Sequence, residues 1–244
     1  MDNNLRNTNI NKIEYATIST ENKLLRSSFS WMALAMLLTS LTAVLFAFVP
    51  QLSGLLFEPA LTGMKPTLFA YAVMFAPLIF VLAIGFGFQR MSYTTLIGLF
   101  AAYSIINGIS FSTIFYVYHI GSIAKVFLST TALFGVMAIA GYTTRTDLTK
   151  LGSILFIGLI GIVIASLINL FTHSAQMDYI ISILGVIIFT GLTAYDVQKI
   201  KNLGAEMGDS TMTSKLGVMG ALTLYLDFIN LFLFLLRLFG GRKD

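Results

Sequence analysis

The stretch LGVMGALTLYLDFINLFLFLLRLF, residues 216–239, decides the fold of this chain. It is apolar and long enough to cross the roughly 30 Å hydrocarbon core of a bilayer as one helix. Near its middle lies Asp227. A carboxylate at the centre of a membrane helix costs about 2.5 to 3.5 kcal/mol unless it is paired, protonated or facing water. Residues 216–239 therefore predict both a membrane span and a candidate functional residue.

Six more apolar runs precede it, at residues 31–49, 68–88, 93–117, 124–140, 151–171 and 179–196. Hydrophobic residues make up 57% of the chain and charged residues 11%, against roughly 45–50% and 25% in soluble domains. Helices are required because unpaired backbone groups are not tolerated in lipid, and the period-two alternation of a barrel is absent. We therefore predict an all-α domain of seven transmembrane helices over residues 29–244, preceded by a polar, mobile cytoplasmic tail at 1–28.

The distribution of Lys and Arg predicts the orientation, since cytoplasmic segments of membrane proteins are enriched in these residues. With the N-terminus inside, ten basic residues are cytoplasmic and five lie opposite; the five are Lys65, Lys125, Arg237, Arg242 and Lys243. Three of those five are at the C-terminus, so the seventh run either crosses fully or re-enters. Its length favours a full crossing. The short loops favour a bacterial inner membrane.

A second acid, Asp196, closes the sixth run in FTGLTAYDVQKI, residues 189–200, whereas the five earlier runs contain no Asp or Glu. Consecutive helices joined by one loop tend to pack antiparallel, which would bring Asp196 and Asp227 together. Counted from the cytoplasmic ends of their runs, however, Asp196 is about one turn deep and Asp227 two to three turns. Helix tilt or a water-filled cavity would have to bridge this gap. Two carboxyl groups that meet cannot both be ionised cheaply and titrate as a coupled pair.

Other polar residues are weaker candidates. Arg90 ends the second run on the same predicted side as Asp196 and is either its switch partner or an interfacial anchor. Asn230 follows Asp227 by three residues on one helix face, and Tyr195 precedes Asp196. Asn230, Tyr195 and Asn107 are assigned either to an ion pathway or to helix packing.

Several function classes have no support in the sequence. The chain has no Cys, and its two histidines, His119 and His173, lie on separate outer connections without metal-ligand spacing. Gly-rich phosphate loops and hydrolase motifs are missing, and the weak basic excess is topology charge and not a nucleic-acid footprint. We expect no enzymatic activity, no cofactor, no metal site and no nucleic-acid partner.

Residues 189–201, FTGLTAYDVQKIK, resemble the signature of the Bax inhibitor-1 family. The segments at 141–171, 220–244 and 103–118 agree with the bacterial branch of that family. Rare polar residues match as well as apolar ones, and the likeness covers most of residues 70–243. It does not extend to the N-terminal tail and the first run.

The resemblance implies a fold in which six helices surround the last one. It also implies a pH-sensitive calcium leak, with Asp196 and Asp227 as the proton sensor and a second-helix Arg, here Arg90, as the alternative partner of Asp196. The segment between the last two runs is long for the family.

Two other functions stay open. One is an interaction protein that restrains a membrane-bound protease or another quality-control partner through the polar tail; deletion of residues 1–26 would test it. The other is an intramembrane aspartyl protease, because two acids lie on adjacent helices and Tyr195 precedes the first. Against it, Asp227 lies in LYLD, where such proteases carry Gly-x-Gly-Asp, and no Pro-Ala-Leu element follows.

Overall fold

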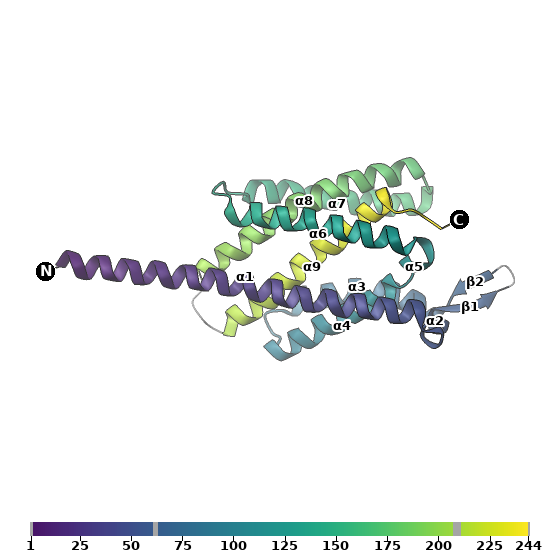
Figure 1. Ribbon diagram of the computed structural model, residues 1–244, viewed down its shortest axis with the longest axis horizontal. Helices are drawn as coiled ribbons and strands as arrows, with labels where there is room; N and C mark the ends of the chain where they lie inside the picture. The colour runs from purple at the N-terminus through teal and green to yellow at the C-terminus, as the bar shows by residue number, and fades with distance from the viewer. Residues whose placement is uncertain (1, 61–62, 207–210, 244) are drawn as a thin grey trace. The chain divides into compact units, whose positions relative to one another are not determined.

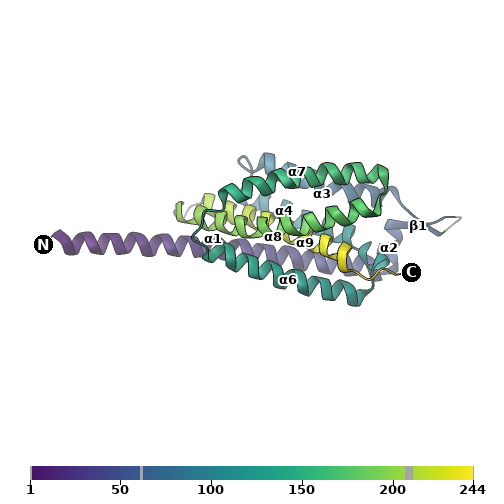
Figure 2. The same ribbon diagram turned by 90° about the horizontal axis from the view of Figure 1, so that it is seen from above.

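A computed structural model describes residues 2–60, 63–206 and 211–243 of the chain, with side chains over 22–59, 64–205 and 212–243. It is nearly all helical, as Figures 1 and 2 show. Within these residues, seven helical segments are long and apolar enough to span a membrane. The prediction of seven transmembrane helices is confirmed. The chain divides into two compact units.

The first unit contains the N-terminal part of α1 (Asp2–Phe48), up to Ser30, and residues Ala124–Phe239, which form most of one long helix and three more after it. These are α6 (Ile120–Thr143), α7 (Thr149–Thr172), α8 (Ala175–Glu206) and α9 (Thr211–Phe239). Helix α8 packs against both α7 and α9. The turn between α7 and α8 is tight because His173 adopts a left-handed conformation, with φ of 49°.

The second unit contains the rest of α1 and the elements up to residue 123, with the residues after Phe239. After α1 come α2 (Pro50–Leu56) and an antiparallel hairpin of β1 (Phe57–Ala60) and β2 (Gly63–Pro66). Then follow α3 (Leu68–Gly87), α4 (Tyr93–Phe111) and the short α5 (Ile114–Val117). Side chains of Thr67 and Ser92 cap α3 and α4 by accepting the backbone N–H of Ala70 and Thr95.

Helix α9 is long enough for the full crossing that the length of the seventh run favours. It runs without a break from Thr211 to Phe239, about 43 Å at 1.5 Å per residue. The residues after it pair with the connection between α5 and α6: His119 N–H donates to Gly241 O at 3.0 Å and Lys243 N–H to Val117 O at 2.9 Å. This connection follows the third span, on the side opposite the predicted cytoplasmic face.

The N-terminal segment is helical. Residues from Asp2 onward belong to α1, and the cytoplasmic location and mobility of the polar tail at 1–28 stay predictions. The helix of the first span continues toward the N-terminus, and Leu24, Leu25 and Ser28 are buried. A deletion that tests the tail therefore has to stop before Asn22, which accepts a hydrogen bond from the Tyr142 hydroxyl at 3.1 Å.

Candidate functional site

Asp196 of α8 and Asp227 of α9 meet inside the first unit. Their carboxyl groups are hydrogen-bonded to each other, and the two residues are 9% and 4% exposed. The two carboxyl groups meet although α8 extends ten residues, about 15 Å, beyond Asp196 and α9 begins sixteen residues, about 24 Å, before Asp227. Distances counted from the helix ends therefore do not decide whether the two acids meet. Residues 197–205 remain helical with Val197, Gln198 and Ile200 buried, while Lys199 is exposed.

One oxygen of the pair is left without a partner. Asp227 Oδ2 is buried and accepts no hydrogen bond from the described residues. Ser28 Oγ, which lies against Gly220 of α9, is likewise buried and unpartnered. Gly220 and Asp227 are seven residues apart and share a helix face. Two buried oxygen atoms therefore lie on the side of α9 that carries Asp227: Asp227 Oδ2 of α9 itself and Ser28 Oγ of α1. Neither makes a hydrogen bond with the described residues.

Aromatic rings close the site on the side of α6. Phe228, next to Asp227, makes edge contacts with Phe127 and Phe134 at ring distances of 5.5 and 5.4 Å. Tyr225 is fully buried. The span in α9 is 67% buried, compared with 6% for that in α7. Within the first unit, α9 contacts α8 and α6, and these contacts bury Asp227.

Glycines bring the neighbouring helices against α8 at Asp196. A Cβ at Gly141 of α6 would overlap the backbone of Ala194, and one at Gly152 of α7 would lie 2.6 Å from the ring of Tyr195. On α9, a Cβ at Gly220 would lie 3.1 Å from Ile200. The segment 194–200 is thus in close contact with three helices, and this fixes where Asp196 lies.

Gln198 is a site residue that the sequence interpretation missed. It is 7% exposed. Its Oε1 accepts the backbone N–H of Leu148 at 2.8 Å and its Nε2 donates to Thr146 O at 2.9 Å. Both partners belong to the connection between α6 and α7, residues 144–148. The available signal was an amide two positions after an intramembrane acid and directly before Lys199, which marks the exposed face of the helix.

Lys199 was also missed. Its charge acts on Asp196, and its Nζ lies 5.9 Å from the centre of the Tyr195 ring. A cavity of about 170 Å³ lies beside it, lined by Thr149, Tyr195, Gln198, Lys199, Asn202 and Leu203. Tyr195, a predicted site residue, therefore lines a polar cavity at the end of α8 and packs against Gly152.

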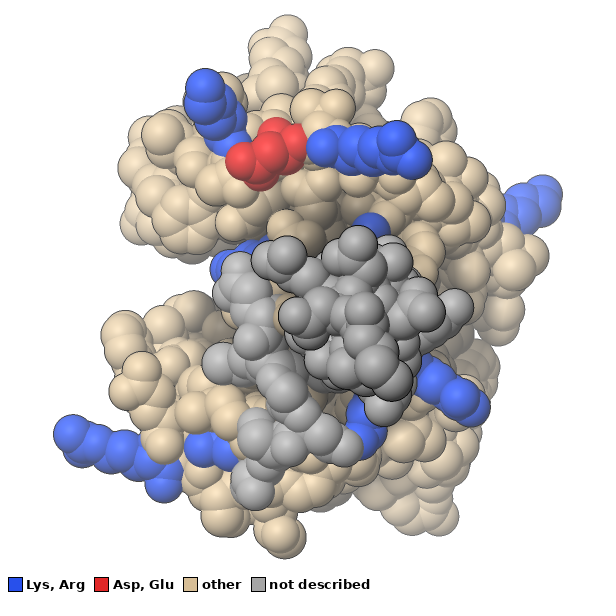
Figure 3. Space-filling model, turned by 90° about the vertical axis from the view of Figure 1, so that its left-hand side faces the viewer, with Lys and Arg blue, Asp and Glu red and all other residues tan. Residues whose placement is uncertain are grey.

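Outside the spans, Asp147 precedes the first turn of α7. Its Oδ1 accepts the backbone N–H of Thr149 at 2.9 Å and the Thr149 hydroxyl at 2.6 Å. These hydrogen bonds, with a smaller contribution from the charge of Lys150, lower the pKa of Asp147. Basic side chains predominate over acidic ones on the face shown in Figure 3.

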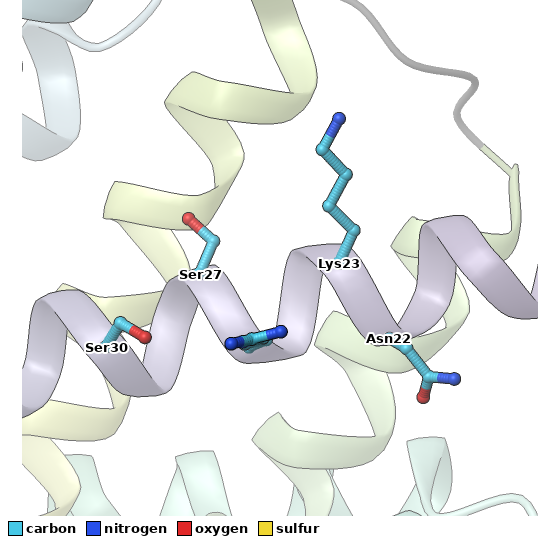
Figure 4. A pocket seen from close by; sticks show the side chains of 5 residues that line it. Asn22, Lys23, Ser27 and Ser30 are labelled. Atoms are coloured by element: carbon cyan, nitrogen blue, oxygen red, sulfur yellow. The ribbon is translucent and has the colours of Figure 1, made fainter.

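A second cavity, of about 470 Å³, lies along α1 and is lined by Asn22, Lys23, Arg26, Ser27 and Ser30. Figure 4 shows Ser27 pointing from α1 toward a neighbouring helix. A Cβ at Gly217 of α9 would lie 2.5 Å from Ser27 Oγ, so α1 and α9 approach closely here. This second cavity lies at the predicted cytoplasmic end of the first span, where Lys23 and Arg26 add basic charge.

The structure does not add the remaining predicted residues to the acid pair. Asn230 donates to Leu226 O of its own helix at 2.8 Å. Asn107 lies in the second unit, buried, and donates to Tyr103 O at 3.1 Å. Arg90 also lies in the second unit, exposed after the end of α3. Its pairing with Asp196 stays a prediction.

Comparison with known proteins identifies the group to which this architecture belongs. A family model described as "Inhibitor of apoptosis-promoting Bax1" matches residues 21–244. The chain belongs to the Bax inhibitor-1 family. The matched range contains Asp196, Asp227 and Gln198, and the match confirms the family that the sequence motifs indicated.

Bacterial relatives of this Bax inhibitor-1 family protein cover nearly the whole chain. The inner membrane protein YbhL of Escherichia coli K12 is 42% identical over 217 residues, 88% of this chain and 90% of the relative. An uncharacterized protein of Rickettsia prowazekii is 42% identical over 216 residues, 88% of each chain. Another, of Borreliella burgdorferi, is 40% identical over 232 residues, 95% of this chain and 97% of the relative. The predicted bacterial inner-membrane location agrees with these relatives.

Proposed function

We propose that this protein is a pH-regulated cation leak of the inner membrane, with calcium as the cation and without enzymatic activity. The observation that carries the proposal is the hydrogen-bonded pair of Asp196 and Asp227, buried on adjacent helices. A hydrogen bond between two carboxyl groups needs a proton on one of them, because two carboxylates offer only acceptors. The contact therefore represents a protonated state of the pair.

Loss of that proton changes the energetics of the site. Two carboxylates in contact repel each other strongly where the surroundings are apolar. Separation of α8 from α9 relieves the repulsion and exposes a negative charge deep in the membrane. A cation that crosses hydrocarbon needs such oxygen ligands to replace its lost hydration. The unpartnered Asp227 Oδ2 and Ser28 Oγ on the same side of α9 supply further oxygen atoms for this path.

Calcium flux into proteoliposomes, measured with a trapped indicator between pH 5 and 8, tests the proposal. We expect the wild type to show pH-dependent flux and Asp227→Asn to lose the dependence, since Asn cannot release a proton. The matched control is Asp178→Asn. Asp178 lies at the other end of α8, where it pairs with Arg237 at 3.4 Å. Flux that is identical in the wild type and Asp227→Asn across this range would refute the proposal.

Arg90 is the proposed alternative partner of the ionised Asp196. A charge-assisted hydrogen bond would stabilise the carboxylate form and oppose proton sharing with Asp227. Arg90→Ala should then move the pH midpoint of flux upward, by about one unit for a bond of typical strength. An unchanged midpoint in a folded Arg90→Ala protein would identify Arg90 as an interfacial anchor.

A further inference from the structure

The connection between α6 and α7 is tied to α8 by a single side chain. Gln198 uses both ends of its amide, accepting from Leu148 N–H at 2.8 Å and donating to Thr146 O at 2.9 Å. Such a bidentate contact replaces the pairing that a neighbouring backbone would give. Because Gln198 is buried, water does not readily substitute for these bonds if the side chain is removed.

The connection at residues 144–148 joins α6 and α7, and both of these helices pack closely against α8 next to Asp196. Gly141, near the end of α6, lies against Ala194, and Gly152, in the first turn of α7, lies against Tyr195. Residues 194, 195 and 198 of α8 are therefore all held by α6, α7 or the segment between them. Asp196 lies inside this set. A shift of α8 at Asp196 has to carry residues 144–148 along or break the two bonds of Gln198.

We infer that Gln198 is a positioning residue that couples the protonation of the Asp196–Asp227 pair to the α6–α7 connection. The inference rests on the proposed function of the pair as a proton sensor. Through Gln198 the connection holds Asp196 against Asp227, and it moves when the pair separates. Gln198 itself does not titrate, so the coupling is mechanical.

Other charged groups near this point have to be separated from the effect. Lys199 of α8 and Asp227 of α9 are the groups whose charges act on Asp196. The α6–α7 connection and the start of α7 bring Arg145, Asp147 and Lys150, and α1 brings Lys23 and Arg26. All of them are kept in the variants below except Arg145, which carries the label in every protein whose mobility is compared. A change between variants therefore cannot come from their titration.

The experiment uses the absence of Cys in the chain. A nitroxide on Arg145→Cys in the full-length protein reports the mobility of the connection between pH 5 and 8. A nitroxide on Thr172→Cys, at the other end of α7, is the control position. We expect the label at 145 to change mobility with pH, the label at 172 to stay constant, and Asp196→Asn to abolish the change at 145.

The decisive variants are Gln198→Met, which keeps the length of the side chain without its hydrogen bonds, and Gln198→Asn, which keeps the amide on a side chain shorter by one methylene; neither adds a titratable group. Met should leave the label at 145 mobile at every pH, and Asn should give an intermediate response. In flux, Gln198→Met should move the pH midpoint about 0.5 to 1 unit toward acid, because the proton-sharing contact is held less firmly. Asn202→Leu, which removes an exposed amide from the same cavity, should change neither.

The two readouts separate this inference from the proposed function. A wild type without pH-dependent flux contradicts the cation leak, while the label at 145 still decides the coupling. If the mobility of the label at position 145 in the wild-type background does not change between pH 5 and 8, the coupling is overturned, whatever the flux measurement shows. A Gln198→Met protein whose label follows pH as the wild type does also overturns it. If Gln198→Met does not fold, Gln198→Asn carries the same comparison.

Discussion

Both units of this protein bury polar side chains inside membrane spans, and in both units hydroxyl groups bond to nearby backbone, as Thr130 and Thr193 do in the first; the acid pair of the first unit is satisfied differently. In the second unit the groups are bonded to nearby backbone: Thr39 donates to Ser104 O at 2.9 Å, Ser104 to Phe100 O at 2.8 Å and Asn107 to Tyr103 O at 3.1 Å. In the first unit, Asp196 and Asp227 bond to each other and Asp227 Oδ2 has no partner among the described residues. A buried polar group inside a membrane span is therefore not a functional site by itself. The candidate site is the pair of carboxyl groups, because these two can form a hydrogen bond with each other only when one of them carries a proton.

The two units use the same means of close packing. In the second unit a Cβ at Gly108 of α4 would lie 2.5 Å from Thr39 O of α1. In the first unit a Cβ at Gly141 would overlap the backbone of Ala194. Small residues let helices approach in membranes, where apolar side chains gain little from leaving lipid. Close packing alone therefore does not distinguish the units, and the buried acids do.

The largest expected effect comes from removing the buried polar group in each unit. Asp227→Leu should abolish the pH dependence of flux completely, because the proton site no longer exists. Asn107→Leu should leave the pH midpoint in place and reduce stability by about 1 kcal/mol, the usual net value of one hydrogen bond. Flux in proteoliposomes and thermal melting in detergent measure the two outcomes. A shifted midpoint in Asn107→Leu would remove the distinction between the units.

The next effect tests the packing around Asp196. Gly141→Val places a branched side chain into the backbone of Ala194 and should cost about 3 kcal/mol or more, since backbone cannot give way as a side chain can. Gly135→Ala in the same helix is the matched control, because a Cβ there meets nothing within 4 Å. We expect a melting temperature several degrees lower for Gly141→Val and unchanged for Gly135→Ala. Equal melting temperatures would mean that α6 does not hold α8 at this point.

Much of this fold could be predicted from composition, because the length and apolarity of a span are local properties. The sequence indicated seven spans and the meeting of Asp196 and Asp227. It did not give the end of α8, because residues 197–205 contain lysines that read as a polar exit although their helix continues. The hairpin of β1 and β2 was missed as well. It depends on pairing such as Glu58 with Lys65, at 3.0 Å, which has no apolar pattern to mark it.

The candidate site shows the same limit more sharply. Acids are conspicuous in an apolar run, so Asp196 and Asp227 could be found from the sequence. Gln198 could not, because its importance comes from Thr146 and Leu148, some fifty positions earlier, and from the burial of its amide. The charge of Lys199 acts on Asp196 in the structure, whereas the sequence singled out Arg90 as the cationic partner. Proximity between helices is a tertiary property that the spacing of residues within one helix does not contain.

The smallest expected effect compares an exposed acid in each unit, Asp147 at the start of α7 and Glu58 in the hairpin. The pKa of Asp147 is lowered by hydrogen bonds from Thr149, so its carboxylate form stabilises the folded state. That stabilisation is fully present above the ordinary Asp pKa of about 3.9 and is lost as the pH falls through the lower pKa of the folded state.

Asp147→Ala should therefore melt about 1 °C below the wild type at pH 7, a size typical of exposed charged contacts. The difference should shrink as the pH falls below the ordinary Asp pKa and vanish once the wild-type carboxylate is protonated as well, because the pKa of Asp147 is lowered in the folded state. Glu58→Ala, which removes the hairpin's pair with Lys65 and leaves the first unit intact, is the control and should leave the pH response of flux unchanged. A deficit in Asp147→Ala that persists at low pH would show that the hydrogen bonds to Thr149 do not depend on the charge of Asp147. The start of α7 would then be held by the contact of Gln198 with residues 146 and 148 rather than by its own acid.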